Sequence, residues 1–394
     1  MYYVADTNRL LAEGVLTPPQ VETLRLQARE TMMQLGINAL LAGGILAATF
    51  GLIFWLASPI SVAAVGFVML ASGAFALTMG QETLRFFGNA AALIGAGMLL
   101  GGAGFELANS YEAIAGPAMM LLGATVAAAF AAIRHYFRDI APFTLGAVFL
   151  MGGALHLAGL GFWAEQLALI GWPAVLAFLY ATAVIIASGI LVNVRFVTAL
   201  AILPFAQALS TGTAYWHAVY AFYSPESTLS ILQMSALVAV GLWAASRLPD
   251  RIGRHGGILA TMGLIVANLC ALVGSLWGDW VGETIWGPQN RSIPFETWEA
   301  RRDAVDAFRE TAIHIPDTAY SILWAVALVA VIIWAANGVR RGVFNTACTF
   351  ACIHAYTQAF ETFGDEPLAY VIGGLTAIPL AWGLWQWNRR MLTP

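Results

Sequence analysis

WPAVLAFLYATAVIIASGILV, residues 172–192, contains no charged side chain and is long enough to cross a lipid bilayer as one helix. A bilayer core about 30 Å thick requires about 20 apolar residues in helical form. The whole chain has this character: 60% of its residues are hydrophobic, only 10% are charged, and its mean hydropathy is +0.75. Soluble domains are far less apolar. The sequence therefore predicts an all-α, polytopic integral membrane protein.

Comparable apolar segments recur from residue 36 to the end of the chain. About twelve of them are long enough to span a bilayer. We place them at residues 36–57, 60–79, 87–105, 114–133, 141–159, 172–192, 194–215, 229–246, 256–277, 319–337, 343–360 and 367–387.

The basic residues predict the orientation of these helices, because short loops rich in basic residues stay in the cytoplasm. Every basic side chain apart from histidine is an arginine. With about twelve spans and a cytoplasmic N-terminus, all but four arginines fall on the cytoplasmic side. The four exceptions lie in one long loop, 278–318, where the rule is not expected to hold: Arg291, Arg301, Arg302 and Arg309. Both termini are therefore expected in the cytoplasm.

Residues 1–33 are polar and predict a separate cytoplasmic module, an amphipathic helical hairpin. Thr17 can cap a helix, Pro18 suits its first turn, and Gln20 completes a capping box. A shorter helix precedes it and ends at Gly14. The hairpin would anchor to the membrane surface or dock a partner. Transmembrane helices 1–9 follow over residues 34–277.

The loop 278–318 is predicted to lie in the periplasm and to contain an amphipathic helix at residues 295–312. Trp298, Val305, Phe308 and Ala312 fall near one face of that helix, with charges between them. Such a helix can rest on the membrane, cover an outward cavity or contact another subunit. Residues 319–394 then hold transmembrane helices 10–12 and a short cytoplasmic tail.

Two segments resemble each other at an offset of about 51 residues. LIGAGMLLGGA at 93–103 aligns with TLGAVFLMGGA at 144–154, which pairs Gly95 with Gly146 and Gly102 with Gly153. Parallel repeats of helical hairpins occur in transporters. Small residues also recur wherever membrane helices pack closely. The sequence leaves both explanations open.

Polar side chains gather at the predicted outer ends of several outward-running helices. Ionisable groups inside a membrane are costly and by default suggest a functional site. His354, Gln358 and Glu361 share one helix face by their spacing. In the alternative, a membrane histidine bonds a neighbouring carbonyl and Glu106 is a solvated helix end. The candidate ligand-binding residues are Glu106, Asn109, Tyr111, His156, His217, His354, Gln358 and Glu361.

GAGFELANSYEAIAG at 102–116 and LLAEGVLTPPQVETL at 10–24 resemble a bacterial family of polytopic inner-membrane proteins known only as a domain of unknown function. That family begins with a cytoplasmic hairpin and carries a Gly-Ala-x-x-x-Leu-x-x-Gln-x-Tyr pattern, to which Gly102, Ala103, Leu107 and Tyr111 correspond. Asn109 or Ser110 stands where glutamine is usual, so no role of that glutamine is carried over. The resemblance covers the first third of the chain. It implies the fold and a multi-pass location in the bacterial inner membrane, and it implies no activity.

Catalytic signatures are missing, since the sequence has no P-loop, HExxH or GxSxG motif. We expect neither an enzyme nor a bound metal or cofactor, and no nucleic-acid partner. The favoured prediction is a protein that transports or binds a small amphiphilic molecule through an outward-facing cavity between the third, fifth, seventh and eleventh helices. The alternative is a non-catalytic structural or accessory subunit of a larger membrane complex. Expected contacts are the lipid bilayer and, in that alternative, other membrane subunits through residues 1–33 and 295–312.

Overall fold

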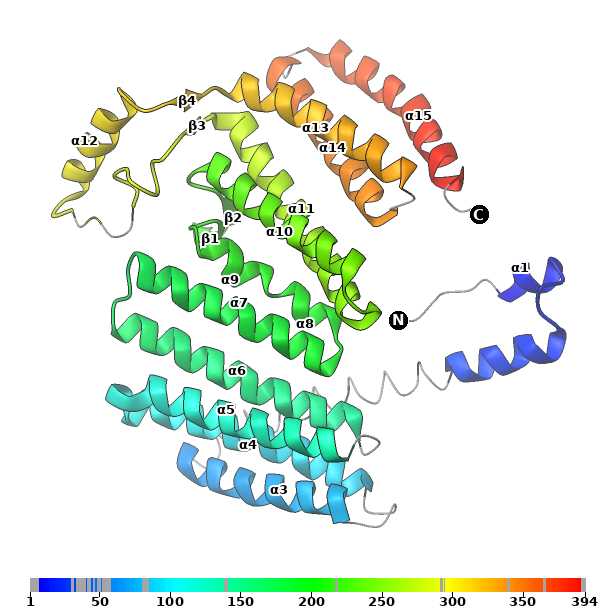
Figure 1. Ribbon diagram of the computed structural model, residues 1–394, viewed down its shortest axis with the longest axis vertical. Coiled ribbons are helices and arrows are strands. Elements are labelled where there is room, and N and C mark those ends of the chain that lie inside the picture. Colours follow the sequence, from blue (N-terminus) through cyan, green and yellow to red (C-terminus); the bar gives the residue numbers. More distant parts are fainter. Residues whose placement is uncertain are drawn as a thin grey trace. The chain divides into compact units, whose positions relative to one another are not determined.

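The computed structural model describes residues 7–29, 58–79, 85–137, 141–216, 219–290, 295–338, 341–363 and 366–390, with isolated positions between them (Figure 1). The chain divides into two compact units, Met1–Trp163 and Ala164–Pro394. Nearly all of its regular structure is helical, which agrees with the predicted all-α class.

Eight helices among the described residues are long and apolar enough to cross a membrane, and they make the chain a multi-pass membrane protein. They coincide with eight predicted spans. Their bounds are α3 Pro59–Met79, α4 Arg85–Ser110, α5 Glu112–Tyr136, α6 Pro142–Gln166, α7 Trp172–Val192, α10 Ser227–Arg247, α11 Asp250–Trp277 and α13 Asp317–Asn337. Large apolar side chains such as Leu121, Val240 and Ile322 are exposed on them and so suit contact with lipid.

The predicted count of about twelve spans is not confirmed. The first predicted span, 36–57, lies outside the described residues. The last two coincide with helices α14 (Arg341–Phe363) and α15 (Pro367–Arg390), which are less apolar than the eight. In α14 the polar side chains of Asn345, His354 and Gln358 interrupt the apolar sequence.

The N-terminal hairpin begins with α1, Thr7–Ala12, and continues as a helix from Pro18 through residue 29. Gly14 turns the chain between them with φ +71°. The backbone N–H of Thr17 donates to the side chain of Gln20 at 2.9 Å, which is the capping-box interaction that the sequence predicts.

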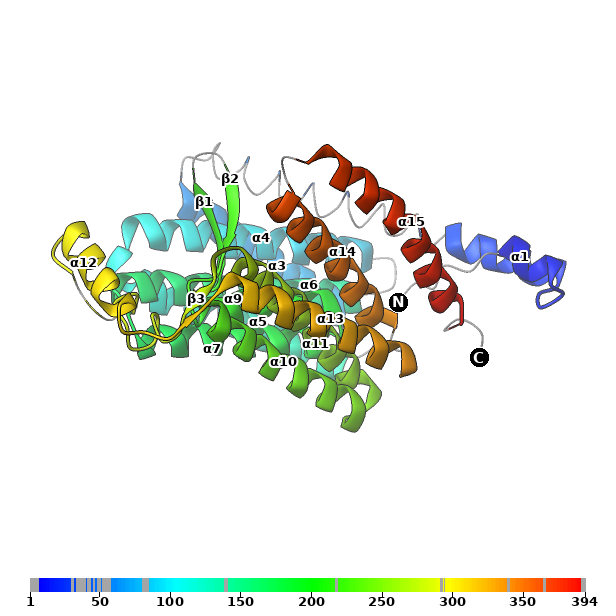
Figure 2. The same cartoon turned by 90° about the horizontal axis from the view of Figure 1, so that it is seen from above.

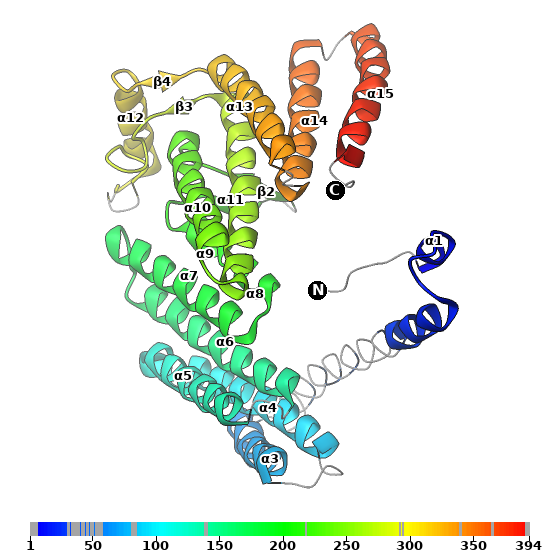
Figure 3. The same cartoon turned by 45° about the vertical axis from the view of Figure 1, so that its right-hand side comes forward.

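Three helical hairpins, α3–α4, α5–α6 and α10–α11 (Figure 3), have glycines at their helix contacts, and in all of these helices but α10 the glycines form a pair seven residues apart. In α5 and α6, a Cβ at Gly123 would lie 2.5 Å from the Gly152 carbonyl oxygen, so the two backbones are in direct contact. The corresponding contacts in three hairpins involve Gly66, Gly73, Gly95 and Gly102 in α3–α4, Gly116, Gly123, Gly152 and Gly159 in α5–α6, and Gly241, Gly256 and Gly263 in α10–α11. The repeat is therefore one of packing positions, in which Gly95 corresponds to Gly152 and not to Gly146.

The predicted span 194–215 is wrong as one continuous helix. The structure has two short helices, α8 Arg195–Ala199 and α9 Ile202–Gln207, followed by the antiparallel strands β1 Gly212–Trp216 and β2 Val219–Tyr223 (Figure 2). Pro204 lacks the N–H that a regular helix needs at this point, and i→i+3 bonds such as Leu203 to Leu200 replace the helical pattern. The β-branched and aromatic residues of GTAYW then favour a strand.

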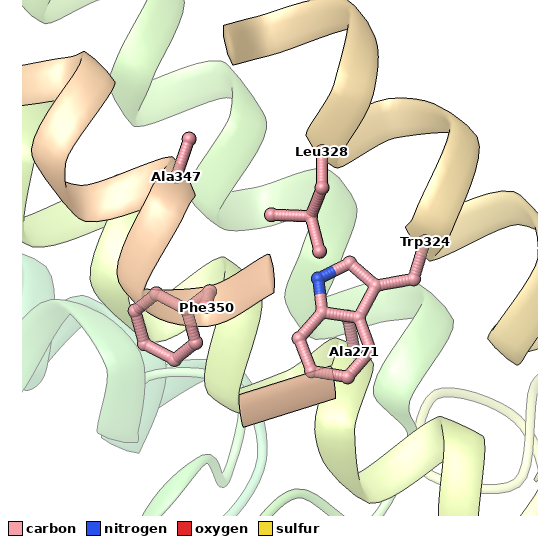
Figure 4. Packing of buried hydrophobic residues seen from close by; sticks show 5 residues of the cluster. All are labelled: Ala271, Trp324, Leu328, Ala347 and Phe350. Carbon is pink, nitrogen blue, oxygen red and sulfur yellow. The ribbon is translucent and has the colours of Figure 1, made fainter. Parts of the chain in front are cut away.

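In the second unit the helices pack around two apolar clusters. Ala271 of α11, Trp324 and Leu328 of α13, and Ala347 and Phe350 of α14 form the larger one (Figure 4). A smaller cluster joins α9 to α10 and contains Ile202, Ala206 and Met234. These clusters fix α9, α10, α11, α13 and α14 relative to one another.

The predicted helix in the long loop exists as α12, Trp298–Arg309, with Thr297 as its N-cap. The two-residue strands β3 (Asp279–Trp280) and β4 (His314–Ile315) pair at the base of this loop (Figure 1). None of the α12 side chains is fully buried, and Trp298 is 82% exposed.

Candidate functional site

The first unit holds four of the predicted ligand residues. Glu106 is partly exposed in α4, Asn109 is exposed near the end of that helix, and Tyr111 is exposed at the break before α5. His156 in α6 lies with its Nδ1 2.8 Å from the carbonyl oxygen of Met120, to which it donates a hydrogen bond. This contact matches the alternative in which a membrane histidine serves helix packing.

The second unit holds the remaining predicted residues. His354 is partly buried in α14 with its ring centre 4.6 Å from that of Trp324, while Gln358 is partly exposed and Glu361 is exposed. His217 lies outside the described residues. The predicted set is thus divided between two units, and the convergence of Glu106 and His156 with His354 stays a prediction.

A group of buried carboxylates at one end of α10 and α11 was not predicted. Glu226, which precedes α10, is 4% exposed. Its carboxylate accepts hydrogen bonds from the backbone N–H groups of Gly282 at 2.7 Å and Thr284 at 3.1 Å, and from the Thr284 hydroxyl at 2.6 Å. Charge-assisted bonds of this kind compensate a carboxylate for its loss of water. Glu226 therefore fixes the 282–284 turn against the start of α10.

Asp279, which lies just after the end of α11, is a second buried carboxylate that accepts hydrogen bonds. Its side chain is 4% exposed. The carboxylate accepts from the backbone N–H of Thr228 at 2.8 Å, from the Thr228 hydroxyl, and from the Tyr320 hydroxyl at 3.1 Å. Asp279 therefore links the ends of α10, α11 and α13 through one side chain.

Glu283 is the third buried carboxylate and is 2% exposed. Arg309 of α12 approaches it to 3.0 Å, and the Arg309 side chain is 39% exposed. Burial raises the pKa of Glu283 above its ordinary value, and the charge of Arg309 opposes this rise without cancelling it. The nearby charge of Asp279 adds to the rise. This ion pair connects α12 to the loop that the other two carboxylates hold.

Buried hydroxyl groups tie the β1–β2 hairpin to the same end of α10. Ser224, after β2, donates to Ser230 at 2.8 Å, and Ser230 in turn donates to the carbonyl oxygen of Glu226 at 3.1 Å. Thr211, before β1, is also hydrogen-bonded to Ser230. Both ends of the hairpin are therefore fixed on α10.

A pocket of about 170 Å³ lies beside these carboxylates, entirely within the second unit. We call it the α7–α9 pocket. It is lined by Gly171, Trp172, Ala174, Val175 and Phe178 from the start of α7, by Gln207, Ala208, Leu209 and Ser210 at the end of α9, by Leu229 of α10, and by Thr284, Ile285 and Asn290 of the loop.

The lining of the pocket is apolar on most sides and carries a few polar groups. Among the described residues, its four polar side chains are those of Gln207, Ser210, Thr284 and Asn290, and none of these lining residues carries a charge. Gln207 is held near the hydroxyl of Tyr223 at 3.4 Å. Thr284 belongs to the turn that Glu226 fixes, so one wall of the pocket depends on that carboxylate. Pockets with apolar walls and a few placed polar groups typically bind small molecules.

Metal binding is not supported by the described part of the chain, where no group of three or more His, Cys, Asp or Glu side chains could hold an ion. Glu226, Asp279 and Glu283 each face their own donors. The sequence marked these residues only weakly, as SPEST before α10 and GDWVGE after α11.

Comparison with protein-family models, with curated proteins and with solved structures found no match to the chain. The resemblance of residues 10–24 and 102–116 to a bacterial membrane-protein family therefore stays a prediction.

Proposed function

We propose that this multi-pass membrane protein binds a small, uncharged amphiphilic molecule in the α7–α9 pocket. The observation that carries the proposal is the lining itself, which combines the aromatic residues Trp172 and Phe178 with the polar residues Gln207, Ser210 and Thr284. An amphiphile with a hydroxyl, carbonyl or amide group can satisfy these polar groups while its apolar part lies against α7. A charged ligand would find no opposite charge among the described residues of this lining.

The size of the pocket limits the part of the ligand that it encloses. A cavity of about 150 Å³ accommodates a benzene ring. The α7–α9 pocket, at about 170 Å³, therefore suits one ring or a short acyl segment. Longer ligands would extend beyond it.

We further propose that the pocket faces outward from a bacterial inner membrane. It lies at the ends of α7 and α10 opposite to Arg195 and Arg247, and arginine-bearing ends are typically cytoplasmic. Both chain termini would then be cytoplasmic. This proposal moves the predicted cavity to α7, α9, α10 and the 284–290 loop. Transport of the bound molecule is the extension that the membrane location favours.

The alternative proposal, an accessory subunit of a membrane complex, is favoured by α12. Its most exposed large side chain is Trp298, and Ile313 just after it is also exposed. Exposed aromatic residues of this kind are enriched in protein interfaces. In that case α12 and the N-terminal hairpin would contact the other subunits.

Native mass spectrometry of the protein extracted with its lipids tests the binding proposal. We expect a small neutral molecule to remain bound to the wild-type protein, and Ala174→Phe to abolish its retention because the new ring fills the pocket. Leu176→Phe is the matched control, since Leu176 is exposed on the same helix and does not line the pocket. Equal retention by the wild type and Ala174→Phe would contradict the proposal.

A further inference from the structure

Positive charge gathers around a buried histidine at the other end of the second unit's helices. The Thr198 hydroxyl of α8 lies 2.6 Å from Nδ1 of His255 in α11, and His255 is almost completely buried. Arg195 precedes Thr198 by three residues and Arg251 precedes His255 by four, so each arginine shares a helix face with the residue that it precedes. The Thr198–His255 contact therefore brings the two arginines to the same place.

Three arginines lie near the Thr198–His255 contact in the sequence. Arg195 and Arg251 share helix faces with Thr198 and His255, and Arg254 directly precedes His255 in α11. Arg251 is occupied, because it donates to the carbonyl oxygens of Ile190 at 2.7 Å and Leu191 at 2.9 Å at the end of α7.

Among the described residues, Arg195 and Arg254 have no such partner. Arg195 and Arg254 form no hydrogen bond or ion pair with the residues that the structure describes, and Asp250 pairs with neither of them. Arg251 and Arg254 also lie in the first turns of α11, where the helix dipole disfavours positive charge. Helix stability therefore does not account for these arginines, and an anion would neutralise them.

An exposed apolar strip begins beside the arginines and runs along α8 and α9. Phe196 is 72% exposed, Leu200 is 40% exposed and Leu203 is 65% exposed. Their spacing of four and three residues places them near one side of the two helices. At 1.5 Å per residue, the exposed strip extends about 10 Å from the arginines along α8 and α9. Leu191 and Val194 are exposed near its start.

We propose that this surface binds one anionic phospholipid of the surrounding bilayer. Arg195 and Arg254 would receive the phosphate and the net negative charge of the headgroup, and an acyl chain would lie along Phe196, Leu200 and Leu203. Basic groups next to apolar helix surfaces are the features that recognise anionic lipids. A zwitterionic lipid shares the apolar tail but lacks the net charge. The proposal is independent of the α7–α9 pocket, which lies at the opposite ends of α7 and α11.

Native mass spectrometry of the full chain with added phosphatidylglycerol or phosphatidylcholine provides the test. We expect the wild type to retain one phosphatidylglycerol in preference to phosphatidylcholine. Each of Arg195→Gln and Arg254→Gln should lower this preference about fivefold, and the double variant about 25-fold. Arg247→Gln is the matched control, because Arg247 is exposed at the same end of the helices and is not among the arginines around His255.

Several results would overturn the proposal. It fails if the wild type shows no preference for phosphatidylglycerol, or if Arg247→Gln lowers the preference as much as Arg254→Gln does. It also fails if millimolar inorganic phosphate displaces the lipid, since the site would then bind a free anion. Arg254→Gln keeps the test valid if the double variant does not fold, because Arg254 has no hydrogen bond to another described residue that the substitution would remove.

Discussion

The carboxylate of Glu283 lies 3.0 Å from the guanidinium group of Arg309, across 26 residues of chain. This ion pair joins α12 to the loop whose residues Thr284, Ile285 and Asn290 line the α7–α9 pocket. Arg309 also lies over the ring of Trp280, 5.8 Å from its centre. The surface helix and the pocket wall are therefore mechanically connected.

Arg309→Gln should destabilise this loop, because it leaves the buried Glu283 carboxylate without its positive partner. Removing one member of a buried pair typically costs about 3–5 kcal/mol. We expect about 1–2 kcal/mol here, because Arg309 is 39% exposed and water already weakens the pair. Thermal unfolding in lipid nanodiscs measures the change. Arg302→Gln, at an exposed position of α12, is the control and should have no measurable effect.

Glu283→Gln should change the pH dependence of stability. The pKa of Glu283 is raised in the folded protein, so the folded state binds a proton more tightly than the unfolded chain does. The stability that this group contributes is fully present below its ordinary pKa of 4.5 and is lost as pH rises through the folded pKa. Glu283→Gln should therefore gain stability relative to the wild type as pH rises above 4.5. A relative loss over this range would show that Arg309 outweighs burial.

Glu226→Gln should loosen the turn that forms one wall of the pocket. The glutamine amide keeps one oxygen and replaces the other with an NH2 group, which would face either the Gly282 N–H or the Thr284 N–H and hydroxyl. Loss of charged hydrogen bonds costs about 1.5–3 kcal/mol. We expect faster hydrogen exchange of the Gly282 and Thr284 amides and weaker ligand retention. Unchanged exchange would contradict this role of Glu226, and Glu299→Gln on the exposed face of α12 controls for the lost charge.

Gly123→Ala should destabilise the α5–α6 hairpin, because the added Cβ would lie 2.5 Å from both the Gly152 oxygen and the His156 nitrogen. Overpacking of this kind costs about 1–3 kcal/mol. Gly161→Ala is the matched control in α6, where a Cβ would have no neighbour within 4 Å. We expect a lower unfolding temperature for Gly123→Ala alone. Equal unfolding temperatures would mean that the two backbones are not in contact.

Apolar length made the spanning helices predictable from the sequence, because a segment such as 172–192 is continuously apolar. The segment 194–215 is also largely apolar, but Pro204 and the strand-forming residues after Gly212 interrupt its helix. A hydropathy profile does not show such an interruption of a helix. The sequence match pairs Gly95 with Gly146, whereas the helix contacts make Gly95 equivalent to Gly152, because hydropathy and composition do not show which glycine faces the neighbouring helix.

The candidate site was less predictable than the fold. Polar residues within predicted spans pointed to His156 and His354 as candidate ligands. The buried carboxylates lie instead just beyond the helix ends, at Glu226, Asp279 and Glu283. A sequence shows them in loops, where charged residues are ordinarily solvated. Only the folded loop, with its N–H groups directed at Glu226, reveals that they are buried.

Photolabelling with a neutral amphiphile that carries a diazirine tests the central claim most directly, because mass spectrometry identifies each labelled residue. We predict labelling of residues 171–178 and 207–210 in the wild type, saturation by unlabelled amphiphile, and loss of this labelling in Ala174→Phe. Labelling concentrated near Glu106, His156 and His354, or spread evenly over the lipid-facing helices, would contradict binding in the α7–α9 pocket.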